Sequence, residues 1–167
     1  NNLLEWSMVK RGLMPFNPVD ISLNKTIEEV IGIFSDNAKK KSIEIETEVQ
    51  KDISVIADKS MLNTILRNLV SNAVKFTKPG GFVRVTVKKF KGSVVITVKD
   101  SGVGMNLDLQ NNLFKLDGKT GRLGTADEKS SGLGLLLCKE FIEMHKGKIS
   151  VISEEEKGTE FSVSFPG

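Results

Sequence analysis

Two runs of alternating apolar and polar residues, FVRVTVKKF at 82–90 and VVITV at 94–98, constrain the fold of this chain more than any other feature. Successive side chains of a β-strand point to opposite faces of a sheet, so each run presents one apolar face. The segment between the runs contains Lys91-Gly92, and a short turn with glycine is typical of a β-hairpin. We therefore predict an antiparallel pair of strands with one face covered by other elements.

Segments with helical spacing are available to cover that face. Amphipathic helices are predicted at 23–41, 60–77 and 133–146. Further strands are predicted at 43–49, 54–58, 148–153 and 159–165. The predicted fold class is α+β, an α/β sandwich in which helices pack on one face of a mixed, mostly antiparallel sheet.

The length of the chain, 167 residues, suits one main domain. NNLLEWSMVKRG at 1–12 has the apolar pattern of the end of an amphipathic helix, and Pro15 and Pro18 follow it. We therefore predict a helical tail at 1–12 and one compact domain at 13–167.

Composition points away from several classes of function. The net charge is +3, and the 24 basic and 21 acidic residues are interspersed, so charge alone gives no support for nucleic-acid binding. Cys138 is the only cysteine, which rules out an internal disulfide and favours a reducing compartment. No apolar run is long enough to span a bilayer. We expect a cytoplasmic domain, and because the sequence does not begin with Met, an upstream membrane anchor stays open.

The common nucleotide-binding motifs are incomplete in this sequence. Two residues after GVGM at 102–105, Leu107 stands where the third glycine of a dinucleotide fingerprint belongs. Leu113 lies five residues before Gly118-Lys119-Thr120, where a P-loop needs glycine. The stretch SGLGLLLC lacks a third glycine as well. Each of these Gly-x-Gly stretches is weak evidence by itself.

Polar side chains on the helix predicted at 60–77 form the first candidate site. Asn68, Asn72 and Lys75 are spaced by four and three residues and share one face. A solvated helix face is the alternative. Asn, however, is less favourable than Ala in a helix interior, and exposed positions are easily filled by Glu, Lys or Arg. Amide oxygens suit Mg²⁺ and Lys suits phosphate, so these side chains favour an oxygen-rich ligand.

Two further features are each open to two interpretations. Gly132 and Gly134 open the helix at 133–146, where free backbone N–H groups favour an anion, or they simply end a flexible loop. The loop at 115–132 is long for a compact domain, which suggests a lid. Its basic residues are phosphate contacts or, more simply, solvated charges: Lys119, Arg122 and Lys129.

These separate features resemble the ordered motifs of one family. LRNLVSNAVKFT is similar to the N box of histidine kinases, DSGVGM to their first glycine box, NLFKL to their phenylalanine box and SSGLGLLLCKEF to their second glycine box. KGTEFSVSFP resembles their closing hairpin. Order and spacing resemble the catalytic ATP-binding domain of two-component sensor histidine kinases over about residues 17–167.

The resemblance implies the Bergerat fold and a base pocket around KDSGVGM. Without the resemblance, this stretch is either a strand exit or a carboxylate aimed into a pocket. With it, Asp100 accepts a hydrogen bond from the adenine amino group, where guanine presents an oxygen. Gly102 and Gly104 let the backbone approach the base.

The resemblance also implies the phosphate side of the site. Asn72 matches the magnesium ligand, and Asn68 and Lys75 match phosphate-side residues, which we expect to be catalytic. The phosphate-binding helix entry corresponds to Gly132, Leu133 and Gly134. The implied reaction is transfer of the γ-phosphoryl group of Mg²⁺-bound ATP to a histidine in a separate dimerisation domain. Its implied partners are that domain in a homodimeric full-length protein and a downstream response regulator receiver domain, without nucleic acid.

Asn68 favours this reaction over its relatives. Hydrolytic members of the wider superfamily and anti-sigma-factor kinases have Glu at this position, four residues before the magnesium Asn, and an amide cannot act as a general base. An ATPase, a serine kinase and a non-catalytic nucleotide-sensing pseudokinase are the alternatives. The sequence departs from the family at two points. Lys146 stands where Gly is common, and Phe114 is the only residue present of the usual aromatic pair in the phenylalanine box.

Three other features are assigned structural roles. Cys138 has apolar neighbours and is expected to be a buried small hydrophobe. The run KKK at 39–41 is interpreted as a solvated surface patch. His145, the only histidine, is interpreted as a protonated residue that complements the dipole of the last helix rather than as a phosphoacceptor.

Overall fold

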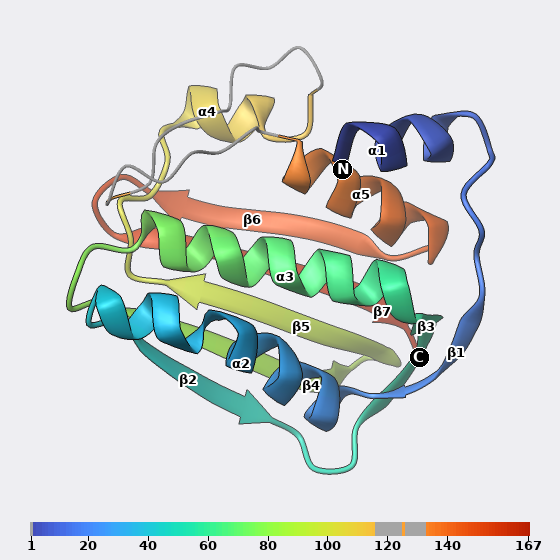
Figure 1. Ribbon diagram of the computed structural model, residues 1–167, viewed down its shortest axis with the longest axis horizontal. Helices are drawn as coiled ribbons and strands as arrows, with labels where there is room; N and C mark the ends of the chain where they lie inside the picture. Colours follow the sequence, from blue (N-terminus) through green and yellow to red (C-terminus); the bar gives the residue numbers. More distant parts are fainter. Residues whose placement is uncertain (1, 116–124, 126–132) are drawn as a thin grey trace.

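The computed structural model describes residues 2–115, 125 and 133–167, which fold into an α/β sandwich (Figure 1). The elements follow the chain as α1 (Asn2–Lys10), β1 (Pro18–Ser22), α2 (Leu23–Lys40), β2 (Glu44–Val49), β3 (Ser54–Asp58), α3 (Lys59–Phe76), β4 (Phe82–Phe90), β5 (Ser93–Asp100), α4 (Leu107–Asn112), α5 (Gly134–Met144), β6 (Lys148–Glu154) and β7 (Gly158–Pro166).

The main sheet has five strands in the order β2-β4-β5-β7-β6, which confirms the predicted mixed, mostly antiparallel sheet. The β2–β4 pair is parallel, and the other three pairs are antiparallel. The hairpin predicted from the alternating runs is the β4–β5 pair. It turns at Lys91 and Gly92, whose φ angles are 49° and 79°, and two positive φ angles are what a type I′ turn requires.

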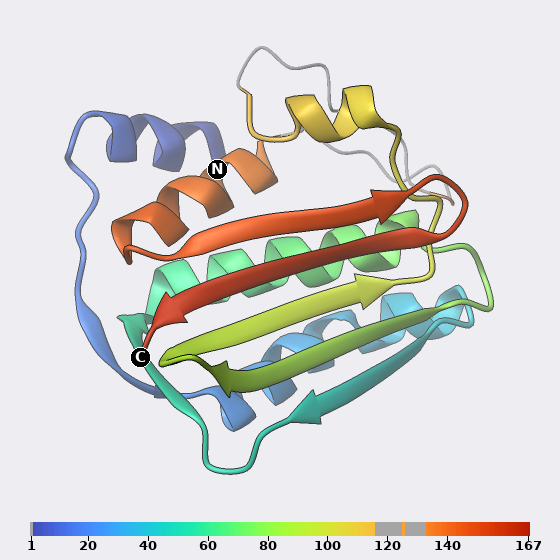
Figure 2. The ribbon, with the colours of Figure 1, turned by 180° about the vertical axis from the view of Figure 1, so that it is seen from behind.

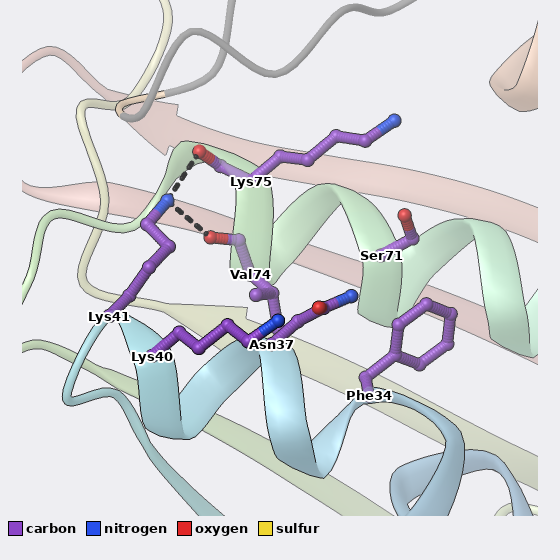
Figure 3. A pocket seen from close by; sticks show the side chains of 7 residues that line it. All are labelled: Phe34, Asn37, Lys40, Lys41, Ser71, Val74 and Lys75. Carbon is purple, nitrogen blue, oxygen red and sulfur yellow. Dashed lines mark hydrogen bonds between the residues drawn. The ribbon is translucent and has the colours of Figure 1, made fainter.

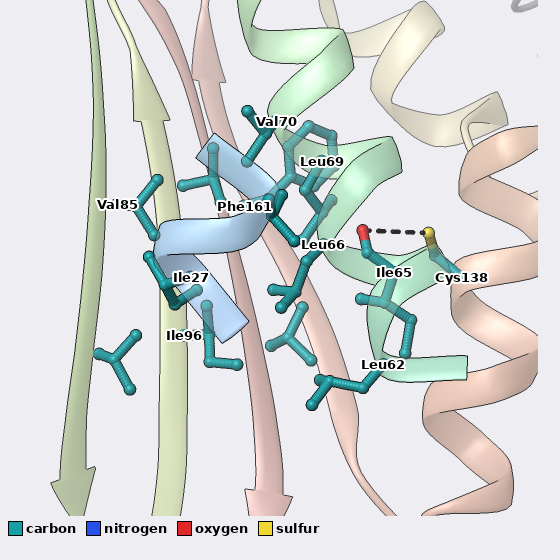
Figure 4. Packing of buried hydrophobic residues seen from close by; sticks show 14 of the residues in the cluster. Ile27, Leu62, Ile65, Leu66, Leu69, Val70, Val85, Ile96, Cys138 and Phe161 are labelled. Atoms are coloured by element: carbon teal, nitrogen blue, oxygen red, sulfur yellow. Dashed lines mark hydrogen bonds between the residues drawn. The ribbon is translucent and has the colours of Figure 1, made fainter. Parts of the chain in front are cut away.

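The helices α2, α3 and α5 cover one face of the main sheet, and the opposite face is open in the described part of the chain (Figures 1 and 2). Alternate apolar residues of β4 and β5 point to the helices and are buried: Val83, Val85, Val87, Val94, Ile96 and Val98. The central helix α3 packs Ile65, Leu66, Leu69 and Val70 into the same core (Figure 4). Full burial of one such side chain contributes about 1.5–3 kcal/mol, so this core fixes α3 on the sheet.

A second sheet of two strands, β1 and β3, leads into α3. The sequence predicted the strand at 54–58, which is β3, but not its pairing with β1. Asp58, at the end of β3, caps α3: its Oδ1 accepts from the N–H of Met61 at 3.0 Å, and its Oδ2 accepts from the N–H of Asn17 at 2.9 Å. This cap sets the position at which α3 begins.

Two further helices complete the description. The short α4 was not predicted, because six residues are too few to show a period; its signal is Asn106, whose Oδ1 accepts from the N–H of Leu109 at 2.8 Å. The predicted helical tail is α1, which lies beside α5, where Lys10 pairs with Glu140 at 2.7 Å. Within the described ranges, no helix is both long and apolar enough to cross a bilayer.

Candidate functional site

The strand β5 ends in a buried carboxylate. Asp100 is 6% exposed, and its Oδ1 accepts hydrogen bonds from the backbone N–H groups of Gly102 at 2.9 Å and Thr159 at 3.3 Å. Two backbone donors on one oxygen fix the orientation of the carboxylate. The carboxylate is therefore buried and fixed at the end of β5, which is compatible with both interpretations of KDSGVGM, a strand exit and a carboxylate aimed into a pocket.

The two glycines after Asp100 are required by neighbouring backbone. A Cβ on Gly102 would overlap the carbonyl oxygen of Phe76 at the end of α3, and a Cβ on Gly104 would overlap that of Glu154 at the end of β6. Gly104 also has a φ of 67°, and the N–H of Val103 between them donates to the carbonyl of Phe76 at 3.0 Å. The first glycine box therefore packs tightly between α3 and the β6–β7 turn.

The polar side chains predicted on one face of α3 are in place. Asn68, Asn72 and Lys75 are all half-buried, while the opposite face of the helix is in the core. The Nδ2 group of Asn68 donates to the carbonyl of Thr64, one turn back, at 2.8 Å. With its nitrogen held in this way, the side chain presents Oδ1 to the start of α5.

Asn68 meets the first turn of α5. Its Oδ1 lies so close to Gly134 that a Cβ on Gly134 would overlap it. One turn further along α5, the Sγ of Cys138 lies 3.8 Å from the carbonyl oxygen of Ile65 (Figure 4). Two features that the sequence predicted separately, the polar face of α3 and the glycine entry of α5, are therefore in contact.

The environment of Cys138 explains its chemistry. The residue is 0% exposed, which confirms the prediction of a buried small hydrophobe. Burial, partly offset by hydrogen bonding from Asn68, raises the pKa of the thiol to about 12. The thiol is therefore neutral at physiological pH and is not a nucleophile.

The carboxyl end of α3 is held by a lysine that the sequence did not single out. The Nζ of Lys41 donates to the carbonyls of Val74 at 2.9 Å and Lys75 at 3.0 Å (Figure 3). It also donates to Oγ1 of Thr125. The N–H of Thr125 donates to the carbonyl of Lys75 at 2.8 Å. Lys41 thus satisfies carbonyls that α3 itself cannot pair, and it ties Thr125 to the same point.

The prediction that the whole run at 39–41 is a solvated patch is wrong for Lys41, which is only 9% exposed. Nothing within the run distinguishes Lys41 from its neighbours, because its burial comes from the end of α3 and not from local sequence. Between α2 and α3 lies a groove of about 280 Å³, at whose rim the ammonium group of Lys75 points away from Lys41 (Figure 3). It is lined by Phe34, Asn37, Lys40, Lys41, Ser71, Val74 and Lys75.

His145 has a different structural role from the predicted one. It is buried, its Nδ1 lies 2.7 Å from the carbonyl oxygen of Phe141, and its Nε2 accepts from the N–H of Asp58 at 3.0 Å. A nitrogen that accepts carries no proton, so the ring is neutral, and the prediction of a protonated histidine is wrong. Phe16 and Phe165 pack edge-on against the ring, with centroids 4.9 Å and 5.4 Å away. The residue joins the start of α3 to the end of α5.

Some predicted site residues lie outside the described residues. They are Gly132 and the basic residues of the predicted lid, Lys119, Arg122 and Lys129. Leu133, which precedes α5 as its N-cap residue, is half-buried.

The side chains near Asn72 fit a magnesium ion whose ligands come mainly from a bound nucleotide and water. Asn72 offers one hard amide oxygen from a half-buried position, one turn from Asn68. Among the described residues, no group of three or more His, Cys, Asp or Glu could hold a metal ion. Mg²⁺ usually keeps several waters and takes few protein oxygens beside substrate phosphates, so a single amide is compatible with it.

Sequence comparisons give one consistent family. Residues 57–167 match the family described as histidine kinase-, DNA gyrase B- and HSP90-like ATPases. The chain is 34% identical over 174 residues to the autoinducer 2 sensor kinase/phosphatase LuxQ of Vibrio vulnificus, which covers 99% of the chain and 20% of that protein. It is 36% identical over 147 residues to sporulation kinase A of Bacillus subtilis, which covers 87% of the chain and 23% of that protein. The chain therefore spans only about a fifth of the length of these relatives.

Solved structures of the same fold agree. The catalytic domain of histidine kinase ThkA has a TM-score of 0.77 at 29% identity, over 92% of this chain and 96% of that one. Full-length ShkA in complex with AMPPNP has a TM-score of 0.86 at 27% identity, over 99% of this chain and 34% of that one. ThkA in complex with the response regulator protein TrrA has a TM-score of 0.77 at 26% identity, over 98% of this chain and 46% of that one.

Proposed function

The chain belongs to the family of histidine kinase-, DNA gyrase B- and HSP90-like ATPases and is a catalytic domain of the kind found in sensor histidine kinases. We propose that it binds ATP with Mg²⁺ and transfers the γ-phosphoryl group to a histidine of another domain. The observation that carries the proposal is that α3 contacts both halves of the candidate site. One half is the loop after Asp100, which packs on Phe76, and the other is the start of α5, which packs on Asn68.

Asp100 is proposed to read the base. A carboxylate only accepts hydrogen bonds at neutral pH, so it selects a purine with an exocyclic amino group, as adenine has, over one with an oxygen there. The backbone donors on Oδ1, from Gly102 and Thr159, hold the group in one orientation before the ligand arrives. This arrangement avoids an ordering cost during binding.

The half-buried polar face of α3 from Asn68 to Lys75 is proposed to hold the phosphates. Gly134 starts α5, and the unpaired N–H groups of a helix start attract anions; Gly132 and Leu133 precede it in the proposed phosphate-binding entry. Asn68 reaches this entry directly, and Lys75 supplies a positive charge on the same face of α3. Asn72 is the proposed ligand of Mg²⁺, which would neutralise charge on the β- and γ-phosphates when bound.

The side chain of Asn68 decides the class of acceptor. A water or serine acceptor needs a general base, and an amide cannot accept the proton. A neutral histidine is already a nucleophile, so it needs only to be placed in line with the γ-phosphate. Transfer to histidine is therefore favoured over ATP hydrolysis and over serine phosphorylation, while the retained polar residues argue against a nucleotide-sensing pseudokinase.

The partners follow from the same proposal. We assign residues 13–167 to the ATP-binding domain and 1–12 to the end of a dimerisation helix, which lies against α5 here. The acceptor would come from the dimerisation domain of a homodimeric full-length protein, and the phosphoryl group would pass to a receiver domain. The complex of ThkA with TrrA supports a receiver partner. A domain with these partners would act in the cytoplasm.

A calorimetric titration tests the proposal. We expect the chain to bind ATP and ADP with Mg²⁺ and to prefer ATP strongly over GTP. Asp100→Ala should weaken ATP binding by about 1.5–3 kcal/mol, the usual worth of a hydrogen bond to a charged group. Asp20→Ala, at an exposed position of β1, is the matched control and should bind like the wild type. Equal affinity of the wild type for ATP and GTP would contradict base reading by Asp100.

A further inference from the structure

Three polar residues stand side by side across three neighbouring strands, on a face that is otherwise apolar. In the strand register Asp100 of β5 lies opposite Thr159 of β7, and Thr159 lies opposite Ser153 of β6. The next two equivalent rows along these strands are Val98, Phe161 and Val151, then Ile96, Val163 and Ile149. Asp100 and Thr159 are each 6% exposed, and Ser153 is half-buried. Polar groups at the margin of a core need partners, and Ser153 has no role in the proposed site so far.

The hydroxyl group of Ser153 is saturated by three neighbours. Its Oγ accepts from the N–H of Met105 at 2.9 Å, donates to the carbonyl of Gly158 at 3.1 Å and lies 2.8 Å from Oγ1 of Thr159. A hydroxyl has one proton and two lone pairs. If the proton of Ser153 is on the Gly158 carbonyl, the Thr159 hydroxyl must donate to Ser153, and all three positions are filled.

These neighbours are the segments that orient Asp100. Thr159 supplies one of the two N–H groups on Oδ1 of Asp100, and Met105 ends the loop that supplies the other, from Gly102. Gln110 of α4 closes the same arrangement: its Nε2 donates to the carbonyls of Met105 at 2.8 Å and Ser153 at 3.2 Å. Ser153 therefore joins both supports of the carboxylate without touching the carboxylate itself.

We propose that Ser153 is a positioning residue of the base pocket, which fixes the orientation of Asp100 through Thr159 and the 101–105 loop. The inference rests on the proposed adenine-binding function. Removing the hydroxyl leaves the buried N–H of Met105 and the hydroxyl of Thr159 without that partner, so both supports can move. The loss of affinity should come from weaker recognition of the adenine amino group and not from weaker binding of the phosphates.

The test compares ATP with ITP, whose base has an oxygen in place of the amino group. Ser153→Ala should weaken ATP binding about tenfold at 25 °C and leave ITP binding within about twofold, so the preference for ATP falls. Ser153→Thr keeps the hydroxyl and should stay within about threefold of the wild type. Ser150→Ala, at an exposed position of the same strand, is the control and should change neither constant.

A second arm uses the double variant with Asp100→Ala. If Ser153 acts through the carboxylate, Ser153→Ala should have no further effect on ATP binding once Asp100 is gone. A full additional loss in that background, or wild-type affinity of Ser153→Ala alone, overturns the proposal. Failure of the wild type to bind ATP would instead refute the proposed function. If circular dichroism shows that Ser153→Ala is unfolded, Ser153→Cys, with its weaker hydrogen bonds and similar size, takes its place and should lose about threefold.

Discussion

Cys138 is the only thiol in the chain, and its surroundings determine whether it reacts. The thiolate is the reactive form, and burial raises the pKa from 9.0 to about 12 in the folded protein. We expect the native chain to react slowly with a thiol-specific disulfide reagent at pH 8 and the urea-unfolded chain to react at once. The pKa of this thiol is higher in the folded chain than in the unfolded chain. Its contribution to the free energy of unfolding is therefore fully present below pH 9 and is lost as the pH rises towards 12.

Labelling rates between pH 7 and pH 10, with and without urea, measure this difference. Cys138→Ala supplies the zero-labelling control. Rapid stoichiometric labelling of the folded chain at pH 8 would contradict the buried, neutral thiol.

Single residues differ in how far sequence alone predicts them. The face of Asn68, Asn72 and Lys75 follows from the helical period, and Asn68 on this face contacts Gly134. Lys41 and His145 could not be assigned in this way. The carbonyls that Lys41 binds on α3 and the N–H of Asp58 that binds His145 lie 33 or more residues away along the chain, so only the tertiary fold shows that both side chains are buried.

The helices α2 and α5 end in left-handed residues that are not glycine. Ser42 has a φ of 55° and Lys146 a φ of 59°, and each donates its N–H back to its helix, to Lys39 at 3.0 Å and Glu143 at 2.9 Å. In this conformation a Cβ costs about 1–2 kcal/mol, and glycine avoids that cost. Part of the gain is offset because glycine makes the unfolded chain more flexible. Ser42→Gly and Lys146→Gly should each stabilise the chain by about 0.5–1 kcal/mol.

Urea unfolding followed by circular dichroism measures both changes. The matched control is Lys39→Gly, inside the last turn of α2, which should destabilise by about 1 kcal/mol because its backbone is helical. The opposite signs distinguish the left-handed backbone from a general effect of glycine. Destabilisation by both Ser42→Gly and Lys146→Gly would rule out strain at these helix ends.

Long helices and strands were predictable from their residue spacing, and short elements were not. The helices α2, α3 and α5 and the β4–β5 hairpin extend over enough residues to show their spacing. The six residues of α4 do not, and neither β1 nor β3 carries in its own five residues any information about its partner. Pairing of distant strands depends on the whole fold, which a local pattern cannot report.

At the scale of the molecule, the chain is proposed to be only one part of a kinase, without the acceptor histidine. Its described residues place no histidine at the candidate site, since His145 is buried between α3 and α5. We expect the isolated chain neither to phosphorylate itself nor to hydrolyse ATP appreciably, because Asn68 cannot activate water. A separate dimeric helical fragment with an acceptor histidine should become labelled from γ-³²P-ATP when the chain is added.

Acid and alkali treatment of the label identifies the product, since phosphohistidine is acid-labile and alkali-stable. Asn72→Ala should abolish transfer by removing the proposed magnesium ligand, whereas Asn111→Ala, at an exposed position of α4, should not. Label on His145 of the chain alone, or on serine of a partner, would refute transfer to a separate histidine.

The position of β7 has a consequence for synthesis. This strand comes after all the others in the sequence, yet it lies between β5 and β6 in the sheet. Until residue 166 has left the ribosome, the nascent chain has a β5 edge from Ser93 to Asp100 that nothing yet pairs, and apolar residues along it face no completed core. The main sheet can therefore be completed only after β7 has been translated, and until then the free edge of β5 is open to pairing with other chains.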